Sequence, residues 1–207
     1  MAVITVPEIL KKRIADAELI FQPVDFQNRS LMTRRRQVLA FPTAYVWAMR
    51  CNLGETEPDE AATIRSFLMR LEGRQNVFRF PVPGYVGRQL SGYTGSAGLV
   101  NGGSQLGRQV ITDGWANSTK VIADGEYLTI NDELKVATAD ASSNGSGAAT
   151  LSFYPPFRVP PPNNAPIVID SPYALMAKAE SEVTAQLRAP HRSKYDLVCE
   201  EAIEVPE

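Results

Sequence analysis

The segment from Val38 to Phe80 constrains the fold more than any other part of the chain. In residues 38–49, both alternating sets of positions are apolar, so an extended strand would carry apolar side chains on both faces. Strands of this kind are normally covered on both sides, and we therefore expect a buried central strand. Leu53-Gly54 then breaks the apolar pattern, which predicts the end of that strand.

An amphipathic helix is predicted over residues 57–72. Residues 56–59 have the composition of a helix start, with Thr56 or Glu57 as the cap and a proline in the first turn. Apolar residues then recur at steps of three and four, and Gly73 follows where a left-handed cap is expected. Because residues 77–80 return to an extended aromatic pattern, the whole unit is read as strand, helix, strand.

The second half of the chain is predicted to consist of short strands. Alternating apolar residues between turn-forming residues predict strands over 106–115, 120–123, 127–130, 134–138, 149–154 and 166–170. Asp124-Gly125 and Asn131-Asp132 are typical turn sequences within this series. Short strands at this spacing favour a small barrel or sandwich.

The expected fold class is mainly β with one or two helices, a β-rich α+β fold. We expect a β-barrel-like, ring-forming module from residues 1–85 together with 171–207, which carries the helix 57–72. Residues 106–170 are expected to form a second small β-barrel or sandwich, and the Gly-rich residues 86–105 a linker or arm. A short helix is expected within 7–17. Residues 173–187 fit either a helix or a strand, and residues 195–203 are expected to form a last strand that pairs back into the first module.

Composition narrows the range of partners. The net charge is −2, with 44% hydrophobic and 21% charged residues, so no basic excess is present to neutralise phosphates. Nucleic acid is therefore not expected as the main partner. No run of about 18 apolar residues occurs and the first residues lack a signal-peptide pattern, so no membrane insertion is expected. Cys51 and Cys199 are expected to be buried free thiols.

No catalytic, metal-binding or cofactor-binding pattern is found in the sequence. His191 is the single histidine and is read as an exposed loop residue. The acidic pairs Asp124/Glu126 and Asp132/Glu133 are read as turn formers at hairpin ends rather than as a glycosidase pair. We therefore expect no enzyme activity, no cofactor and no metal.

Three groups of residues are candidate interface residues. The basic cluster Arg34, Arg35 and Arg36 is either an anion site or a solvated turn that leads into the central strand. Tyr93 and Leu99 are expected to anchor the Gly-rich segment, on the body or on a partner. Phe157 and Arg158 lie in the Pro-rich segment 155–166, a second candidate for interface contacts.

The order of scaffold residues resembles that of minor tail proteins of long-tailed bacteriophages, and within that class the distal tail (baseplate hub) protein. The resemblance covers most of residues 25–170. Its first half is carried by Arg29-Ser30, Thr33, Gln37, Val46-Trp47, Glu60-Ala61-Ala62, Phe67-Leu68, Leu71-Glu72-Gly73-Arg74 and Phe78. Its second half is carried by Gly107, Gly114-Trp115, residues 123–130, Thr138, Asp140, residues 145–151 and residues 155–158.

The resemblance implies a structural role. It implies a β-barrel that carries one helix, a second β domain that faces outward, and self-association in a ring, commonly a hexamer, that joins the tail tube protein to the tip or hub proteins. The expected location is the tail tip of the virion, after synthesis in the host cytoplasm. Two other readings stay open. One is a carbohydrate- or host-surface-binding module over 106–170, with Trp115, Tyr127 and Tyr154 in an exposed groove. The other is an enzyme acting on cell-wall polymer, which needs two acids in a cleft.

Overall fold

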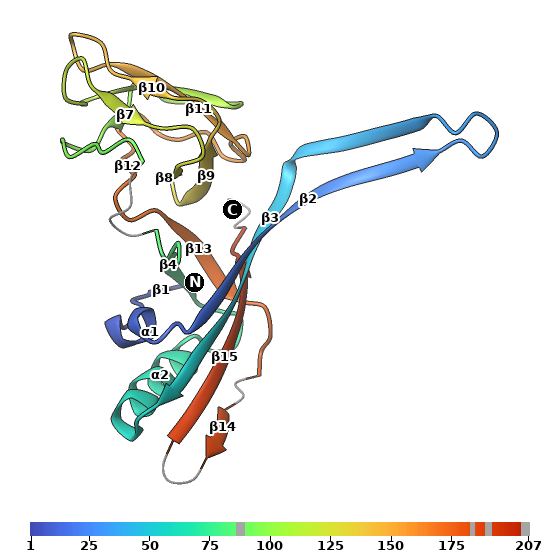
Figure 1. Ribbon diagram of the computed structural model, residues 1–207, viewed down its shortest axis with the longest axis vertical. Helices are drawn as coiled ribbons and strands as arrows, with labels where there is room; N and C mark the ends of the chain where they lie inside the picture. Colours follow the sequence, from blue (N-terminus) through green and yellow to red (C-terminus); the bar gives the residue numbers. More distant parts are fainter. Residues whose placement is uncertain (86–89, 183–184, 189–191, 204–207) are drawn as a thin grey trace.

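The computed structural model describes residues 1–85, 90–182, 185–188 and 192–203. The predicted mainly β fold is confirmed, because 47% of the residues lie in strands and 9% in two helices within the described part. The strands form a curled half-barrel and a nearly closed barrel. Figure 1 shows these two sheets one above the other, with a long hairpin that projects from the side of the molecule.

The half-barrel is a seven-stranded sheet with strands from both ends of the chain. Its order is β1-β4-β13-β15-β3-β2, and β14 pairs with β15 beside this path. The strand β15 lies between β13 and β3, which confirms that a C-terminal strand returns to the first sheet. The strands are β1 (Val3–Ile4), β2 (Asp16–Arg29), β3 (Arg36–Thr56), β4 (Val77–Pro81), β13 (Tyr173–Lys178), β14 (Ala185–Arg188) and β15 (Arg192–Glu201).

Two helices lie against one side of this sheet. The helix α2 (Pro58–Arg70) begins where its sequence predicts: Glu57 is the N-cap, and its backbone N–H donates to the Glu60 carboxylate at 3.1 Å. Gly73 follows the helix with a φ of +71°, a conformation that glycine adopts at little cost. The helix α1 (Glu8–Lys12) is shorter than the range 7–17 expected for it.

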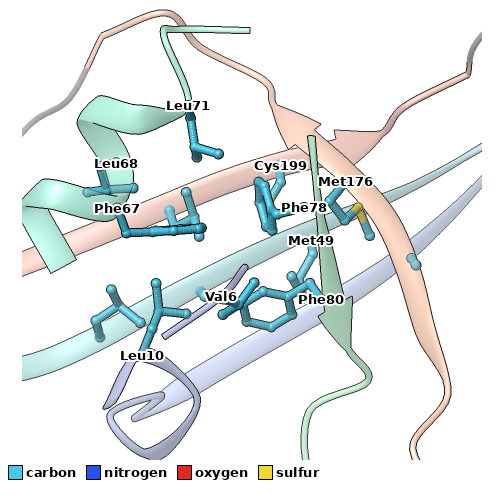
Figure 2. Close-up of a cluster of buried hydrophobic side chains, with 14 of the residues drawn as sticks. Val6, Leu10, Met49, Phe67, Leu68, Leu71, Phe78, Phe80, Met176 and Cys199 are labelled. Atoms are coloured by element: carbon cyan, nitrogen blue, oxygen red, sulfur yellow. The ribbon is translucent and has the colours of Figure 1, made fainter. Parts of the chain in front are cut away.

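The core of the first sheet fills the space between the sheet and the helices. Phe67, Leu68 and Leu71 from α2 and the following turn face Phe78 and Phe80 from β4 (Figure 2). Each of these side chains is at most 4% exposed. Burial of large apolar side chains stabilises a fold by roughly 1.5–3 kcal/mol each, so this cluster holds the half-barrel together. Val6, Leu10, Met49, Met176 and Cys199 complete the labelled group.

The second sheet takes its strands from the middle of the chain and curls nearly into a closed barrel. Its order is β12-β8-β9-β11-β6-β5, and a bridge between Leu99 and Pro166 brings its two ends together. A separate pair, β7 (Lys120–Ile122) and β10 (Ala141–Ser142), lies beside it. The six strands are β5 (Leu99–Val100), β6 (Gln109–Asp113), β8 (Tyr127–Ile130), β9 (Glu133–Ala137), β11 (Ala149–Tyr154) and β12 (Ile167–Val168).

The expectation that the central strand is covered on both sides is wrong. Within β3, Tyr45, Trp47 and Met49 are buried, but the alternate residue Ala44 is exposed and Val46 is half-buried. One face of the sheet is packed on the core and the other is open, as is common in antiparallel sheets. An apolar sequence on both faces of a strand therefore does not guarantee two covering layers.

The expected end of that strand at Leu53-Gly54 is also wrong. The strand β3 continues to Thr56 and absorbs Gly54 in a bulge, because the register with β15 shifts between Lys194 and Asp196. Gly54 has a φ of +41°, which explains a glycine at this point. The ambiguous range 173–187 contains the strands β13 and β14 in its described part and no helix there.

Candidate functional site

The most prominent surface feature is the outer part of the β2–β3 hairpin, residues 24–43, which we call the hairpin arm. A register shift between Pro23 and Asp25 separates it from the sheet. Beyond this shift the two strands pair only with each other in the part of the chain that the structure describes. Figure 1 shows the hairpin arm extending away from both sheets.

One face of the hairpin arm is apolar and exposed. Phe26 and Leu39 are direct cross-strand partners, and they are 64% and 57% exposed. Val24 and Phe41 lie two residues nearer the base of their strands, where the register shifts, and they are also exposed apolar residues. They are 50% and 47% exposed. The other face is mostly polar, for example at Gln27.

The tip of the hairpin arm exposes two more apolar residues. The N–H of Ser30 donates to the carbonyl of Arg35 at 3.0 Å, and the N–H of Arg34 donates to the carbonyl of Ser30 at 2.9 Å. These bonds close a tight turn around Leu31 and Met32. The two side chains are 97% and 95% exposed, so the turn presents them almost completely to the surroundings.

Four arginines surround this tip. Arg29 and Arg36 are directly opposite each other in the ladder, an arrangement that is destabilising for like charges. Arg34 and Arg35 follow in the turn. Among the described residues none of the four has an ion-pair partner. The predicted basic cluster is therefore an exposed turn that leads into β3, and its role as an anion site stays a prediction.

The hairpin arm is incomplete as an isolated structure. A two-stranded hairpin alone is at best marginally stable in water, and it normally needs a third strand or a packed face. Here the exposed apolar residues of the arm belong to neither buried core of the described chain. A contiguous exposed apolar surface with a polar border is typical of an interaction site. The hairpin arm is therefore the candidate functional site, and the chemistry it offers is binding.

The other predicted interface residues lie elsewhere, away from the hairpin arm. Tyr93 is 5% exposed, and its hydroxyl donates to the Ser96 carbonyl at 2.7 Å while its ring packs against Trp115. Leu99 is half-buried in β5, opposite Asp113 of β6. Both residues attach the Gly-rich segment to the second sheet. A contact with a partner at these positions stays a prediction.

Phe157 and Arg158 lie at the junction between the two sheets. Phe157 is 1% exposed and packs against Phe153. The Nη2 atom of Arg158 donates to the Glu201 carboxylate at 2.6 Å and to the Tyr45 carbonyl at 2.7 Å. Phe157 and Arg158 therefore both make contacts within their own chain. Their role in a contact between chains is untested.

A buried polar cluster at this junction was not identified from the sequence. The Lys135 ammonium donates to the Tyr45 hydroxyl at 2.8 Å, to the Glu133 carboxylate at 2.6 Å and to the Pro156 carbonyl at 2.8 Å. Burial lowers the pKa of Lys135 to about 8, against the opposing effect of Glu133. The one available signal was a lysine between the apolar residues Leu134 and Val136 of a predicted strand.

The aromatic residues expected in a carbohydrate-binding groove do not lie together. Trp115 is 4% exposed in the core of the second sheet. Tyr127 contacts Trp47, and Tyr154 contacts Phe21. Stacking on sugars needs accessible ring faces, so this arrangement lacks the feature on which the carbohydrate-binding reading depends.

The acidic pairs have structural contacts. The Glu126 carboxylate accepts hydrogen bonds from the N–H groups of Ala123 and Ser91, and Asp132 forms an ion pair with Arg79. Within the described ranges, no group of three His, Cys, Asp or Glu residues could hold a metal ion. The prediction for His191 lies outside the described residues.

The cysteines occupy adjacent strands of the first sheet. Cys51 in β3 and Cys199 in β15 are both buried and free, as expected. Burial raises the pKa of the Cys51 thiol to about 12 and also raises the pKa of Cys199.

Comparison with models of protein families gave no match to this chain, and a search of curated proteins also found no similar sequence. Neither of the two described helices is long and apolar enough to cross a membrane.

Proposed function

We propose that this chain is a structural protein of a bacteriophage tail tip, similar to distal tail (baseplate hub) proteins. In this role it forms a ring that joins the tail tube to the tip complex. The observation that carries the proposal is the uncovered apolar face of the hairpin arm, with Phe26 and Leu39 at its centre. A projecting apolar surface of this kind is typical of a contact between the subunits of an assembly.

The geometry of the hairpin arm favours a ring over an isolated dimer. A projecting hairpin that fits a different surface on the next copy makes a head-to-tail contact, and such contacts close into rings when the rotation allows. The strand β2 is also at the end of the first sheet, so among the described residues no strand pairs with the backbone groups of its outer edge. Edges of this kind can accept a strand from a neighbouring chain. A hexamer is the expected size, from the resemblance to tail proteins.

The residues that carry the resemblance include the hairpin arm. Arg29, Ser30, Thr33 and Gln37 all lie on it or at its tip. The matching residues 155–158 lie at the junction of the two sheets instead. The resemblance therefore covers the surface proposed for assembly and also the contacts that orient the second sheet. Both features support a subunit that forms a ring with one module and presents the other.

The proposed location can be tested on virus particles. Gold-labelled antibodies against the purified chain, applied to particles of the virus that encodes it, are expected to bind at the junction of tail tube and tip in negative-stain images. Pre-immune serum is the control. Labelling of the capsid, or absence of label from both intact particles and particles with a disrupted tip, would contradict the proposal.

A further inference from the structure

We infer that the tip of the hairpin arm docks on the open face of the first sheet in a neighbouring copy, in a hollow bordered by Asp16, Glu18 and Asp196. This inference rests on the proposed function, because it identifies the surface that receives the hairpin arm in the ring. The three acids lie on β2 and β15, on either side of β3.

The hollow is a defined feature of the open face. It has a volume of about 270 Å³ and extends over β2, β3 and β15. The register places Asp16, Asn52 and Asp196 side by side across the three strands. In the next row, Glu18 lies beside Arg50. Val198 supplies an apolar side chain on this face, whereas Cys51 and Leu197 border the hollow from within the strands and their side chains point into the core.

The hollow carries uncompensated negative charge. Glu18 and Arg50 form its single ion pair, at 4.0 Å, and both side chains are about two-thirds exposed, so the pair is weak. Neither Asp16 nor Asp196 has an ion-pair partner among the described residues. Three acids and one arginine leave the lining with a net charge of −2.

The hairpin arm carries the opposite charge. Residues 24–43 contain four arginines and one aspartate, which gives +3. The whole chain has a net charge of −2, so the remaining residues together carry −5. The four unpaired arginines repel one another at the tip, as the acids do in the hollow. Bringing the two surfaces together relieves both repulsions, and complementary charge of this kind also fixes register between partners.

The tip also brings apolar surface to this contact. Leu31 and Met32 are nearly fully exposed in the single chain, so docking would remove apolar surface of both side chains from water.

The tip cannot reach the hollow of its own chain. Asp16 is the first residue of β2 and Arg29 is the last. Thirteen steps along an extended strand span about 43 Å at roughly 3.3 Å per residue. Because both features belong to one continuous strand, the contact has to form between two copies. A contact between the two ends of the same strand is head-to-tail, which is the type of contact that a ring requires.

A reciprocal charge-reversal experiment tests this inference. The tip variant carries Arg34→Glu, Arg35→Glu and Arg36→Glu. Its hollow is unchanged, but its negatively charged tip is repelled by the negatively charged hollow of the neighbouring copy. Sedimentation velocity at micromolar concentration is expected to show at least a tenfold loss of the assembled fraction relative to the wild type.

The hollow variant carries Asp16→Lys, Glu18→Lys and Asp196→Lys and is expected to lose assembly in the same way. An equimolar mixture of the two variants restores both attractive contacts, so it is expected to form rings of alternating subunits. All of the substituted residues are exposed, and unchanged urea unfolding would show that both variants fold.

The matched control reverses three exposed arginines on and after α2, with Arg65→Glu, Arg70→Glu and Arg74→Glu. It changes the net charge by the same amount and is expected to assemble normally. A tip variant that assembles like the wild type, or a mixture that stays monomeric, overturns the docking inference and leaves the proposed ring intact. A wild-type chain that never assembles overturns both proposals.

Discussion

The Lys135 ammonium lies 2.6 Å from a carboxylate oxygen of Glu133, and the lysine side chain has no exposure to solvent. The same ammonium donates a hydrogen bond to the Tyr45 hydroxyl at 2.8 Å. Tyr45 belongs to β3, the strand that also forms one side of the hairpin arm. The cluster therefore connects the second sheet directly to the strand proposed to make the ring contact.

Loss of the lysine is expected to destabilise the fold. Lys135→Met leaves the Glu133 carboxylate without its cation in a buried site, and removal of one partner from such a pair costs about 3 kcal/mol. Urea unfolding measures the change in the free energy of unfolding. The double variant Lys135→Met/Glu133→Gln is expected to recover part of the loss, because no unpaired charge remains. Equal stability of the single variant and the wild type would show that the pair contributes nothing.

The same residue predicts a dependence of stability on pH. Burial lowers the pKa of Lys135 to about 8 in the folded chain, from an ordinary value of 10.5. Between these pH values the unfolded chain binds a proton that the folded chain lacks, so the free energy of unfolding rises with pH. From pH 7.5 to 9, the wild type is expected to gain about 1 kcal/mol relative to Lys135→Met.

The wild type is compared with Lys135→Met because other buried groups change the free energy of unfolding with pH in the opposite direction. The raised pKa values of Cys51 and Cys199 lower stability above about pH 9, where unfolded thiols ionise. This effect is common to the wild type and the variant. A difference between them that stays constant from pH 7.5 to 9 would contradict the prediction.

The apolar face of the hairpin arm is expected to matter for assembly and not for folding. Phe26→Ser with Leu39→Ser removes exposed side chains, so the free energy of unfolding of the monomer should change by no more than about 0.5 kcal/mol. The assembled fraction in sedimentation is expected to fall sharply. The control Met69→Ser, at a residue on α2 that is 59% exposed, should leave both quantities unchanged. Normal assembly of the double variant would exclude this face as a contact.

Two glycines of the second module should differ sharply in their tolerance of a methyl group. A Cβ atom at Gly98 would clash with the Trp115 ring, and that ring is buried. Gly98→Ala is therefore expected to cost about 1–3 kcal/mol, the usual range for overpacking. At Gly145 a Cβ atom meets nothing within 4 Å, so Gly145→Ala should be neutral. Thermal unfolding of the two variants measures the difference, and equal melting temperatures would contradict it.

Local signals in the sequence were sufficient to predict several of the regular elements. The helix α2 has Glu57, one of the two caps predicted, as its N-cap and is followed by Gly73 in the predicted conformation. The hairpin of β8 and β9 also lies where alternation and turn residues predict it. These features depend on residues a few positions apart, so a single sequence contains the information.

Features that depend on distant residues were not predicted. Lys135 and Tyr45 are 90 positions apart, and no local pattern indicates that they meet. Apolar residues such as Leu39 and Phe41 predicted a strand correctly, but the sequence does not show whether a strand stays on the body or leaves it. The apolar face of the hairpin arm was missed as an interface for this reason, and only the arginines 34–36 at its tip were candidate interface residues. Whether a strand residue is exposed depends on how the whole chain packs, and the alternation of residues along the strand does not determine it.

The central claim is that the hairpin arm joins copies of this chain, and sedimentation velocity tests it most directly. The test compares the wild type with a variant in which residues 26–39 are replaced by an Asn-Gly turn, which closes the ladder at Asp25 and Ala40. The wild type is predicted to sediment at micromolar concentration as one closed oligomer. The shortened variant is predicted to sediment as a single chain, somewhat lighter than the 22.7 kDa of the wild-type chain, with its unfolding transition intact. A wild-type chain that sediments as a monomer, or a shortened variant that forms the same oligomer, would contradict the claim.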